Sequence, residues 1–506
     1  MSASATIREL VDAGRDDDIA FASPDRPPLS YAGLRRHIAD TARALNERGV
    51  GRCDRVAIVL PNGPEMASAF VSVASAATTA PLNPAYKRPE YDFYLSDLGA
   101  RTLIVAEGSD SPAVGCAAKL GIPVLELRVD DAAPAGTFEL IGDGPGGEAA
   151  AGWARADDIA LVLHTSGTTS RPKIVPLAHR NVCASAHNIR RTLSLTDDDR
   201  CMNVMPLFHI HGLMAATLAP LSAGASIFCT PGFHALKFFG WLDEARPSYY
   251  TAVPTMHQAV LARAGRNREV LERAALRFIR SSSSSLPPQV MAELEDVFGA
   301  PVVEAYAMTE AAHQMTCNPL PPGRRKPGTV GPAAGPEVAI MDEGGTLLAQ
   351  GATGEIVIRG ANVTDGYENN PAANAEAYTN GWFRTGDQGT MDEDGYVTIT
   401  GRLKEIINRG GEKISPREVD EALMDHPCVL QVVTFAVPHD KLGEEVAAAA
   451  VLREGMEATP EEIREFAATC LASFKVPRTV LIVDEIPKGP TGKLRRIGMA
   501  EQLGLA

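Results

Sequence analysis

The sequence predicts an α/β protein in two parts, a large N-terminal α/β domain of several layers and a small C-terminal α+β domain. The chain has 506 residues, more than one ordinary hydrophobic core holds. Segments with helical spacing alternate with short apolar runs typical of buried strands. Beyond residue 400 the pattern changes to a segment with many charges, a Gly pair and a helix start. We therefore expect domains at 1–401 and 405–506, joined by a hinge at 402–404.

The alternation can be followed along the N-terminal part. Apolar side chains recur every three or four residues over 31–48, which indicates a helix, and the apolar run VAIVLP at 56–61 indicates a buried strand. Residues 128–157 are rich in Asp, Ala, Gly and Pro and predict a surface excursion. On the same grounds we expect helices over 63–76 and 88–98, and strands over 102–107, 122–127 and 159–164.

The C-terminal part alternates in the same way on a smaller scale. No internal repeat is visible in it or elsewhere. We expect strands over 432–437, 446–452 and 479–484, a helix over 460–472, and a basic tail after them. These elements predict a small domain of its own.

Composition and charge narrow the classes of partner. The net charge of −15 argues against a general nucleic-acid-binding or anionic-membrane surface. Eight cysteines without a CxxC pair indicate reduced thiols, with neither a disulfide framework nor a zinc site. The sequence has no secretory-type N-terminus, no apolar run long enough to cross a bilayer and no SKL-type C-terminus. We expect a cytoplasmic protein without nucleic-acid or membrane partners.

The stretch HTSGTTSRPKIVPL, residues 164–177, follows the strand expected at 159–164. Loops at the carboxyl ends of strands are where α/β sheets usually bind ligands. Backbone N–H groups and hydroxyls can surround phosphate oxygens there, while Lys173 neutralises charge. The stretch lacks the GK[ST] ending of a Walker A loop, so as an isolated pattern a polar turn explains it equally well.

Further segments carry residues suited to a nucleotide. In EAYAMTE, Tyr306 can stack on a base, Thr309 can donate to a phosphate and Glu310 can hold Mg²⁺. In WFRTGD, Asp387 can accept from a ribose diol. Taken singly, each of these acids is more often a solvated or capping residue, and PKGPTGKLRR is more often a basic tail. GDGPGG at 142–147 has too little chain after it for a crossover helix, so we expect a surface turn there.

Five segments together make the sequence more specific. TSGTTSRPK, YAMTE, WFRTGD, GRLKEIINRGGEKISP and PTGKLRR occur in this order. In them, over nearly its whole length, the chain resembles the acyl-activating, adenylate-forming superfamily of acyl-CoA synthetases, luciferases and peptide-synthetase adenylation domains. The resemblance implies that ATP activates a carboxylate as an acyl-adenylate, with release of pyrophosphate, and that a thiol then takes the acyl group.

The resemblance also implies roles for individual residues. Glu310 would bind Mg²⁺, Thr309 would contact the α-phosphate, and Lys493 would bridge the carboxylate and the α-phosphate, so these three are the expected catalytic residues. The residues expected to contact ATP or AMP, from the phosphate loop through the adenine-packing tyrosine to the ribose-binding pair, are Thr165, Ser166, Gly167, Thr168, Thr169, Lys173, Glu304, Ala305, Tyr306, Asp387 and Arg402.

A mobile small domain is a further implication. In the family this domain rotates about a hinge, which Lys404 matches here. The rotation withdraws Lys493 and brings up the segment with Arg409, Gly410 and Gly411, which we expect to contact coenzyme A. ATP, Mg²⁺ and coenzyme A are thus the expected cofactors and co-substrates.

The phosphate loop departs from the family pattern at two positions. Many relatives have Gly where this chain has Ser170 and Ile174. Because Ile adopts positive φ with difficulty, this end of the loop is expected to follow a different path.

The serine run in RFIRSSSSSLPP, residues 277–288, indicates the class of acid. Relatives have SGGAPL-like residues there, lining the nucleotide and acyl pocket, whereas this chain supplies hydroxyl donors. A buried second carboxylate would need such donors. HxH in PLFHIHG without a third ligand nearby is weak evidence for a metal, and a lone His is more often structural. The expected substrate-pocket residues are His209, His211, Ser282, Ser283, Ser284 and His313.

FIRSSSSSL, YAMTEAAH, HTSGTTSRPK and INRGGEKISP resemble the oxalate–CoA ligase branch of the superfamily. This resemblance implies that oxalate, ATP and coenzyme A give oxalyl-CoA, AMP and pyrophosphate, with Ser283 and His313 at the distal carboxylate. Alternatives are a ligase for another short-chain, malonate-like or aromatic acid, an enzyme that loads a carrier protein, a luciferase-type oxygenase and a non-catalytic sensor. The oligomeric state does not follow from the sequence.

Overall fold

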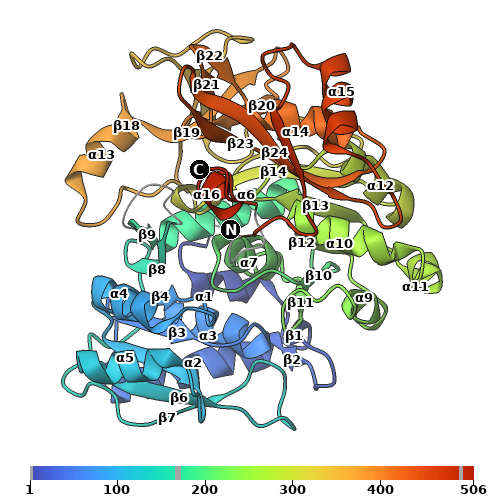
Figure 1. Cartoon of the computed structure of the whole chain (residues 1–506). Helices are drawn as coiled ribbons and strands as arrows, with labels where there is room; N and C mark the ends of the chain where they lie inside the picture. Colours follow the sequence, from blue (N-terminus) through green and yellow to red (C-terminus); the bar gives the residue numbers. More distant parts are fainter. Residues whose placement is uncertain (1–3, 166–171, 489–493) are drawn as a thin grey trace.

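The computed structural model describes residues 4–165, 172–488 and 494–506, and these form four sheets (Figure 1). Two large sheets lie in the N-terminal part, and two five-stranded sheets follow. Central strands of the large sheets pair in parallel, as alternating strands and helices require. The predicted α/β fold, with a large N-terminal and a smaller C-terminal region, is confirmed.

The seven-stranded sheet has the order β7-β6-β5-β3-β4-β8-β9. Its two edge strands, β7 and β9, pair antiparallel with their neighbours. The strands are β3 (Arg55–Val59), β4 (Thr78–Pro81), β5 (Thr102–Ala106), β6 (Val124–Arg128), β7 (Glu139–Ile141), β8 (Ile159–His164) and β9 (Ile174–Ala178).

The eight-stranded sheet has the order β15-β14-β13-β12-β10-β11-β1-β2. From β1 to β14 its neighbouring strands are parallel, and β15 and β2 close the two edges antiparallel. The strands are β1 (Ile19–Ala22), β2 (Leu29–Ser30), β10 (Arg200–Asn203), β11 (Ser226–Cys229), β12 (Tyr249–Ala252), β13 (Phe278–Ser282), β14 (Val302–Met308) and β15 (His313–Cys317).

Helices α3 (Pro64–Ala74) and α6 (His179–Thr192) contact strands of both large sheets and therefore lie between them. Ten of the eleven α3 residues are buried, as expected for a helix that is apolar on every side. The other N-terminal helices are α1 (Ile7–Leu10), α2 (Tyr31–Glu47), α4 (Arg88–Leu98), α5 (Pro112–Leu120), α7 (Ile210–Leu213), α8 (Ala219–Leu221), α9 (Phe238–Ala245), α10 (Pro254–Ala264), α11 (Arg268–Arg273) and α12 (Pro288–Phe298).

The last two sheets divide near the predicted hinge, because β20 ends at Arg402 and β21 begins at Ile407. The hinge at 402–404 stays a prediction. The first sheet and its helix comprise β16 (Glu337–Met341), β17 (Gly354–Arg359), α13 (Pro371–Ala377), β18 (Tyr378–Thr379), β19 (Trp382–Met391) and β20 (Val397–Arg402). The second sheet and its helices comprise β21 (Ile407–Arg409), β22 (Glu412–Ile414), α14 (Pro416–Met424), β23 (Val429–His439), β24 (Gly443–Leu452), α15 (Pro460–Cys470), β25 (Thr479–Ile482) and α16 (Met499–Gln502).

The expected elements occur, with two differences. The surface excursion at 128–157 contains β7, a three-residue edge strand too short to show a period. The serine run, expected to offer its hydroxyls to the pocket, begins inside the sheet, because Ser281 and Ser282 continue β13 and are fully buried. Strand pairing on both sides of β13 supplies the backbone partners that allow these two serines inside the sheet.

The cysteines and the helices concern two further expectations, reduced thiols and the lack of a membrane-spanning segment. All eight cysteines are free, and five of them are buried. Burial raises the pKa of these five thiols, which keeps them protonated and unreactive at neutral pH. In the part of the chain that the structure describes, no helix is long and apolar enough to cross a membrane.

The outer edge of β15 is closed by a close backbone approach at Gly331. The Cys317 N–H donates to Pro332 O (3.2 Å), and the Thr316 hydroxyl donates to Val330 O (2.7 Å). Gly331 has φ +80°, and a Cβ there would lie 2.1 Å from the carbonyl carbon of Cys317. Only glycine fits this position without displacing the strand that begins at His313.

We expect Gly331→Ala to lower the free energy of unfolding by about 3 kcal/mol, because the new methyl group meets backbone that cannot rotate away. Gly99→Ala is the matched control, since Gly99 also has positive φ but a Cβ there meets nothing within 4 Å. Its loss should be about 1 kcal/mol, from the left-handed backbone alone. Urea unfolding of both variants measures the difference, and equal losses would contradict the close approach.

Candidate active site

The predicted phosphate loop joins β8 to β9. At its base, Thr165 N–H donates to Lys173 O (2.9 Å), and Lys173 N–H donates to the Thr165 hydroxyl (3.2 Å). Ile174 is the buried first residue of β9 and pairs with His164, so its backbone is extended and does not need the positive φ that glycine adopts easily. The remaining expected loop residues, Ser166, Gly167, Thr168 and Thr169, and also Ser170, lie outside the described residues.

Glu310 is joined to the end of that loop through Tyr367. The Tyr367 hydroxyl donates to Glu310 Oε1 (2.8 Å), and Lys173 Nζ lies 4.3 Å from the centre of the Tyr367 ring. Burial raises the pKa of Glu310, and the Tyr367 hydroxyl, Arg402 and Lys173 oppose this shift. A buried carboxylate beside a lysine at strand ends is a fitting place for a hydrated cation and phosphate.

Asp387, on β19, links its own sheet to the eight-stranded sheet through its side chain. Tyr306, on β14, donates its hydroxyl to Asp387 Oδ2, and Arg402 Nε donates to Asp387 Oδ1 (3.1 Å). Asp387 and Arg402 are direct partners in the β19–β20 pairing. Burial raises the pKa of Tyr306, and the neighbouring Asp387 carboxylate adds to that shift. The structure thus brings together all three residues expected at the adenine and ribose.

Three of the expected substrate residues form a buried donor cluster. His211 Nδ1 lies 3.1 Å from the Ser283 hydroxyl, and the rings of His211 and His313 stack with centroids 4.9 Å apart. His211 Nε2 lies 2.7 Å from the hydroxyl of Thr251 on β12. His211 and His313 are fully buried. The cluster also contacts Arg280 of β13, which is fully buried as well.

Backbone strain marks the same cluster. Ser283 has φ +76° and His313 has φ +94°, both uncommon for residues other than glycine. The preceding Ala312 also has positive φ (+44°). Such conformations cost about 1–3 kcal/mol each and concentrate at functional sites.

The other expected substrate residues lie elsewhere. The Ser282 hydroxyl donates to Ala305 O (2.8 Å) within the sheet, and Ser284 is exposed. His209 is the N-cap of α7, where its Nδ1 accepts from His211 N–H (3.3 Å). The HxH pair is therefore divided, with only His211 in the donor cluster.

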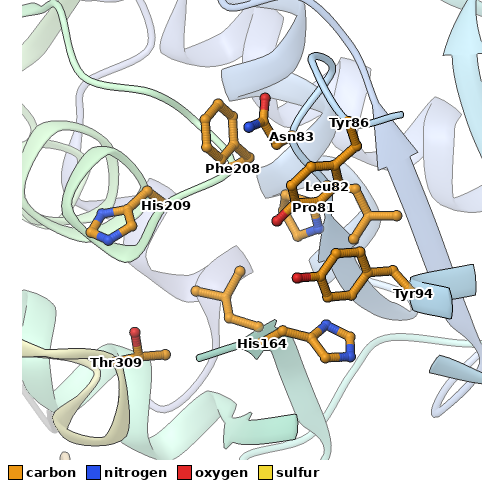
Figure 2. A pocket seen from close by; sticks show the side chains of 10 residues that line it. Pro81, Leu82, Asn83, Tyr86, Tyr94, His164, Phe208, His209 and Thr309 are labelled. Carbon is orange, nitrogen blue, oxygen red and sulfur yellow. The ribbon is translucent and has the colours of Figure 1, made fainter. Parts of the chain in front are cut away.

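His209 and Thr309 line a small cavity of about 40 Å³ (Figure 2). Tyr86 and Tyr94 line it opposite His209, and His164 lies below them in this view. Two lining residues lie close in sequence to the donor cluster, because His209 is two residues before His211 and Thr309 is four before His313. A second, more apolar cavity of about 270 Å³ shares the wall residues Leu82 and Phe208 with the first.

The small domain carries the remaining expected residues. Arg409 Nε donates to Glu445 (2.5 Å), a carboxylate that is 3% exposed, and Gly410 and Gly411 both have positive φ in the turn between β21 and β22. Lys404 follows β20. Lys493 lies outside the described residues.

Glu304, beside Ala305 on β14, is a buried carboxyl group at the edge of the site. Its Oε1 accepts from Leu286 N–H (2.8 Å), and no described group donates to its Oε2. Burial raises the pKa of Glu304 to about 7, and the charge of Arg417 opposes the shift.

With this geometry in place, two family models match the chain. The model of the AMP-binding enzyme covers residues 9–368, and that of the AMP-binding enzyme C-terminal domain covers residues 418–493. The first alone spans well over half of the sequence. The chain belongs to the AMP-binding enzyme family.

Individual relatives of this AMP-binding enzyme agree over almost its full length. It is 44% identical to "Oxalate--CoA ligase" of Arabidopsis thaliana, over 96% of this chain and 97% of the relative. It is 43% identical to "Oxalate--CoA ligase" of Saccharomyces cerevisiae, over 89% and 87%. Among solved structures, ATP-bound MatB from Rhodopseudomonas palustris superposes with a TM-score of 0.87 at 29% identity, over 97% of each chain.

The sequence did not identify three residues of the site in this AMP-binding enzyme, namely Tyr367, Thr251 and the buried Arg280. Tyr367 is 57 residues from Glu310, and Thr251 is 40 residues from His211, so no local pattern links them. Arg280 directly precedes the serine run, and an arginine inside an apolar strand was the pattern that could have indicated a functional residue.

We expect protonation of Glu304 to affect stability. The pKa of about 7 in the folded protein lies above the ordinary glutamate value of 4.5. The contribution of the protonated Glu304 to stability is therefore full below pH 4.5 and is lost as pH rises to about 7. Relative to Glu304→Gln, the wild type should therefore lose on the order of 3 kcal/mol of unfolding free energy across this window. Urea unfolding at pH 4.5, 5.5, 6.5 and 7.5 measures it.

Glu454→Gln is the control for this series, because Glu454 is an exposed glutamate in a turn. Its stability difference from the wild type should stay constant across the window. A Glu304→Gln difference that is equally flat would contradict a raised pKa.

Proposed function

We propose that this enzyme joins oxalate to coenzyme A through an oxalyl-adenylate, using ATP and releasing AMP and pyrophosphate. The observation that carries the proposal is the buried donor cluster of His211, Ser283 and His313, in which His313 follows Thr309 and Glu310 by four and three residues. The two relatives named as oxalate–CoA ligases support the same acid and the same acceptor.

The reaction begins at the α-phosphate. One carboxylate oxygen of oxalate attacks the α-phosphorus of ATP, and the bond to the bridging oxygen breaks with loss of pyrophosphate. The coenzyme A thiol then loses its proton and attacks the activated carbonyl carbon, and AMP leaves with the electron pair of the broken C–O bond. Both steps build negative charge that positive groups and N–H or O–H donors must stabilise.

The second carboxylate of oxalate sets the polarity of the pocket. It does not react, yet it must enter a largely buried site with its charge. Burying an ionised carboxylate without donors costs several kcal/mol or more. The Ser283 hydroxyl, held by His211, and the imidazole of His313 supply donors, whereas the Ser282 hydroxyl is bonded within the sheet and Ser284 is exposed.

The nucleotide residues act by position and charge. Asp387 and Arg402 hold the ribose, Tyr306 borders the adenine, and Thr309 donates to the α-phosphate. Glu310 fits Mg²⁺, because it is a buried carboxylate and hard oxygen ligands suit this ion. When bound, Mg²⁺ neutralises phosphate charge.

The mobile domain supplies the remaining groups. Lys493 is the cation for adenylation, Lys404 is the pivot, and Arg409, Gly410 and Gly411 form the coenzyme A segment. The Arg409–Glu445 pair supports this segment as a fixed hairpin, because the ion pair ties β21 to β24 behind the glycine turn.

Pyrophosphate release with ATP, Mg²⁺ and coenzyme A, across a panel of acids, tests the function. The panel contains oxalate, malonate, acetate, hexanoate and 4-coumarate, with a reaction lacking acid as the blank. We expect release that depends on oxalate and oxalyl-CoA by mass spectrometry. A higher kcat/KM for another acid overturns oxalate and retains the ligase, whereas oxalate-dependent pyrophosphate without oxalyl-CoA points to a carrier-protein acceptor.

We expect His313→Ala to raise the oxalate KM at least about 10-fold, because a donor to a buried carboxylate is lost. The ATP KM should change by less than about 2-fold. His37→Ala is the matched control. His37 is a buried histidine of α2, outside the site, and its ring packs against that of Phe138 with the centroids 4.3 Å apart. Unchanged oxalate kinetics in His313→Ala would remove that residue from the pocket.

A further inference from the structure

Arg280 is a buried cation beneath the donor cluster. It lies in the middle of β13 and is fully buried. No carboxylate within 4–165, 172–488 or 494–506 forms an ion pair with it. Burial accordingly lowers the pKa of its guanidinium. A cation without a counter-ion costs several kcal/mol in a protein interior, so its retention calls for an explanation.

The hydrogen bonds of Arg280 are long and go to neutral groups. Its Nη1 lies 3.4 Å from the Thr251 hydroxyl and 3.5 Å from His211 Nε2, and its Nη2 donates to Gln314 Oε1 (3.3 Å). Its Nε has no partner in the described structure. These contacts orient the guanidinium but leave most of its charge uncompensated.

The contacts also fix the direction of each hydrogen bond. Arginine can only donate, so both His211 Nε2 (3.5 Å) and the Thr251 oxygen (3.4 Å) accept from Arg280 Nη1. Because Nε2 is an acceptor, the Thr251 hydroxyl donates its proton to it across 2.7 Å. With Nε2 accepting, a neutral His211 carries its proton on Nδ1 and donates to the Ser283 oxygen, 3.1 Å away. The Ser283 proton is then available to an acceptor outside the chain of hydrogen bonds.

The backbone holds Ser283 for this task. Its φ of +76° is strained for a serine, and such a conformation persists only where the surroundings impose it. Ser283 is half-buried, unlike Ser282 inside the sheet and Ser284 at the surface. It is the one residue of these three that both contacts His211 and remains partly open.

We propose that Arg280 is a positioning residue for dianionic acids, which orients the donor chain Thr251–His211–Ser283 toward the distal carboxylate and places a positive charge behind that chain. The inference rests on the proposed function and adds how the acid is selected. Monocarboxylates bring no second charge and gain nothing from Arg280.

A double-mutant cycle tests the chain of contacts, with Arg280→Met, Ser283→Ala and the double variant in the full-length enzyme. Oxalate-dependent pyrophosphate release gives kcat and KM. Arg280→Met should lower kcat/KM for oxalate about 100-fold, mainly through KM. Ser283→Ala should lower it about 30-fold. The double variant should stay within about 3-fold of Arg280→Met, because both changes break one chain.

Two further readouts separate positioning from folding. Arg280→Lys keeps the charge and should recover part of the loss, while the ATP KM should stay within about 2-fold of the wild type in every variant. If Arg280→Met does not fold, Thr251→Val takes its place in the cycle, with an expected loss of about 10-fold alone and less than about 2-fold on Ser283→Ala. Thr102→Val is the matched control, a buried threonine of β5 whose hydroxyl donates to Pro123 O (2.9 Å), and it should leave oxalate kinetics unchanged.

The outcomes separate the two proposals. A wild-type enzyme without oxalate-dependent release overturns the proposed function and this inference with it. A wild type that uses oxalate, combined with losses that multiply in the double variant, overturns the inference alone. The same holds if Arg280→Met leaves the oxalate KM unchanged.

Discussion

The carboxylate of Asp387 holds the site together. It accepts from Tyr306 of the eight-stranded sheet and from Arg402, the last residue of the next sheet. These contacts set the position of β19 against β14 and the point from which the chain leaves for the small domain. Asp387 is 6% exposed, so water competes little for its oxygens. Nucleotide residues that are far apart in sequence are thus placed by one acid.

Three ionisable side chains around this centre are buried with little compensation of their charge. Arg280, Glu304 and Glu310 are all at most 7% exposed. Burial lowers the pKa of Arg280 and raises the pKa of the two glutamates, so it favours the neutral form of each group. They lie on the neighbouring strands β13 and β14 or in the turn after β14. Folding alone gains nothing from such groups, whereas a ligand rich in charge does.

Much of the fold could be predicted from the sequence because its elements are long and periodic. The run at 88–98 matches α4, whose proline near the start and Gly99 at the end are visible in the sequence. The site was predictable only as motifs. The serine run shows why the rest was not. Ser282 is bonded within the sheet whereas the next residue, Ser283, lies beside His211, and only the β13–β14 pairing decides between them. Thr251 and Tyr367 carry no motif, and their roles come from tertiary proximity.

Leu82 and Phe208 line both of the cavities described above, which differ in size and polarity. On one side lies the small cavity with His209 and Thr309, and on the other the larger one bordered by Leu60, Met66 and other apolar side chains. Neither wall residue contacts the nucleotide groups through a described hydrogen bond. Substitution of these two residues by smaller ones can therefore change the range of acids that the protein accepts, while the nucleotide-binding residues stay the same.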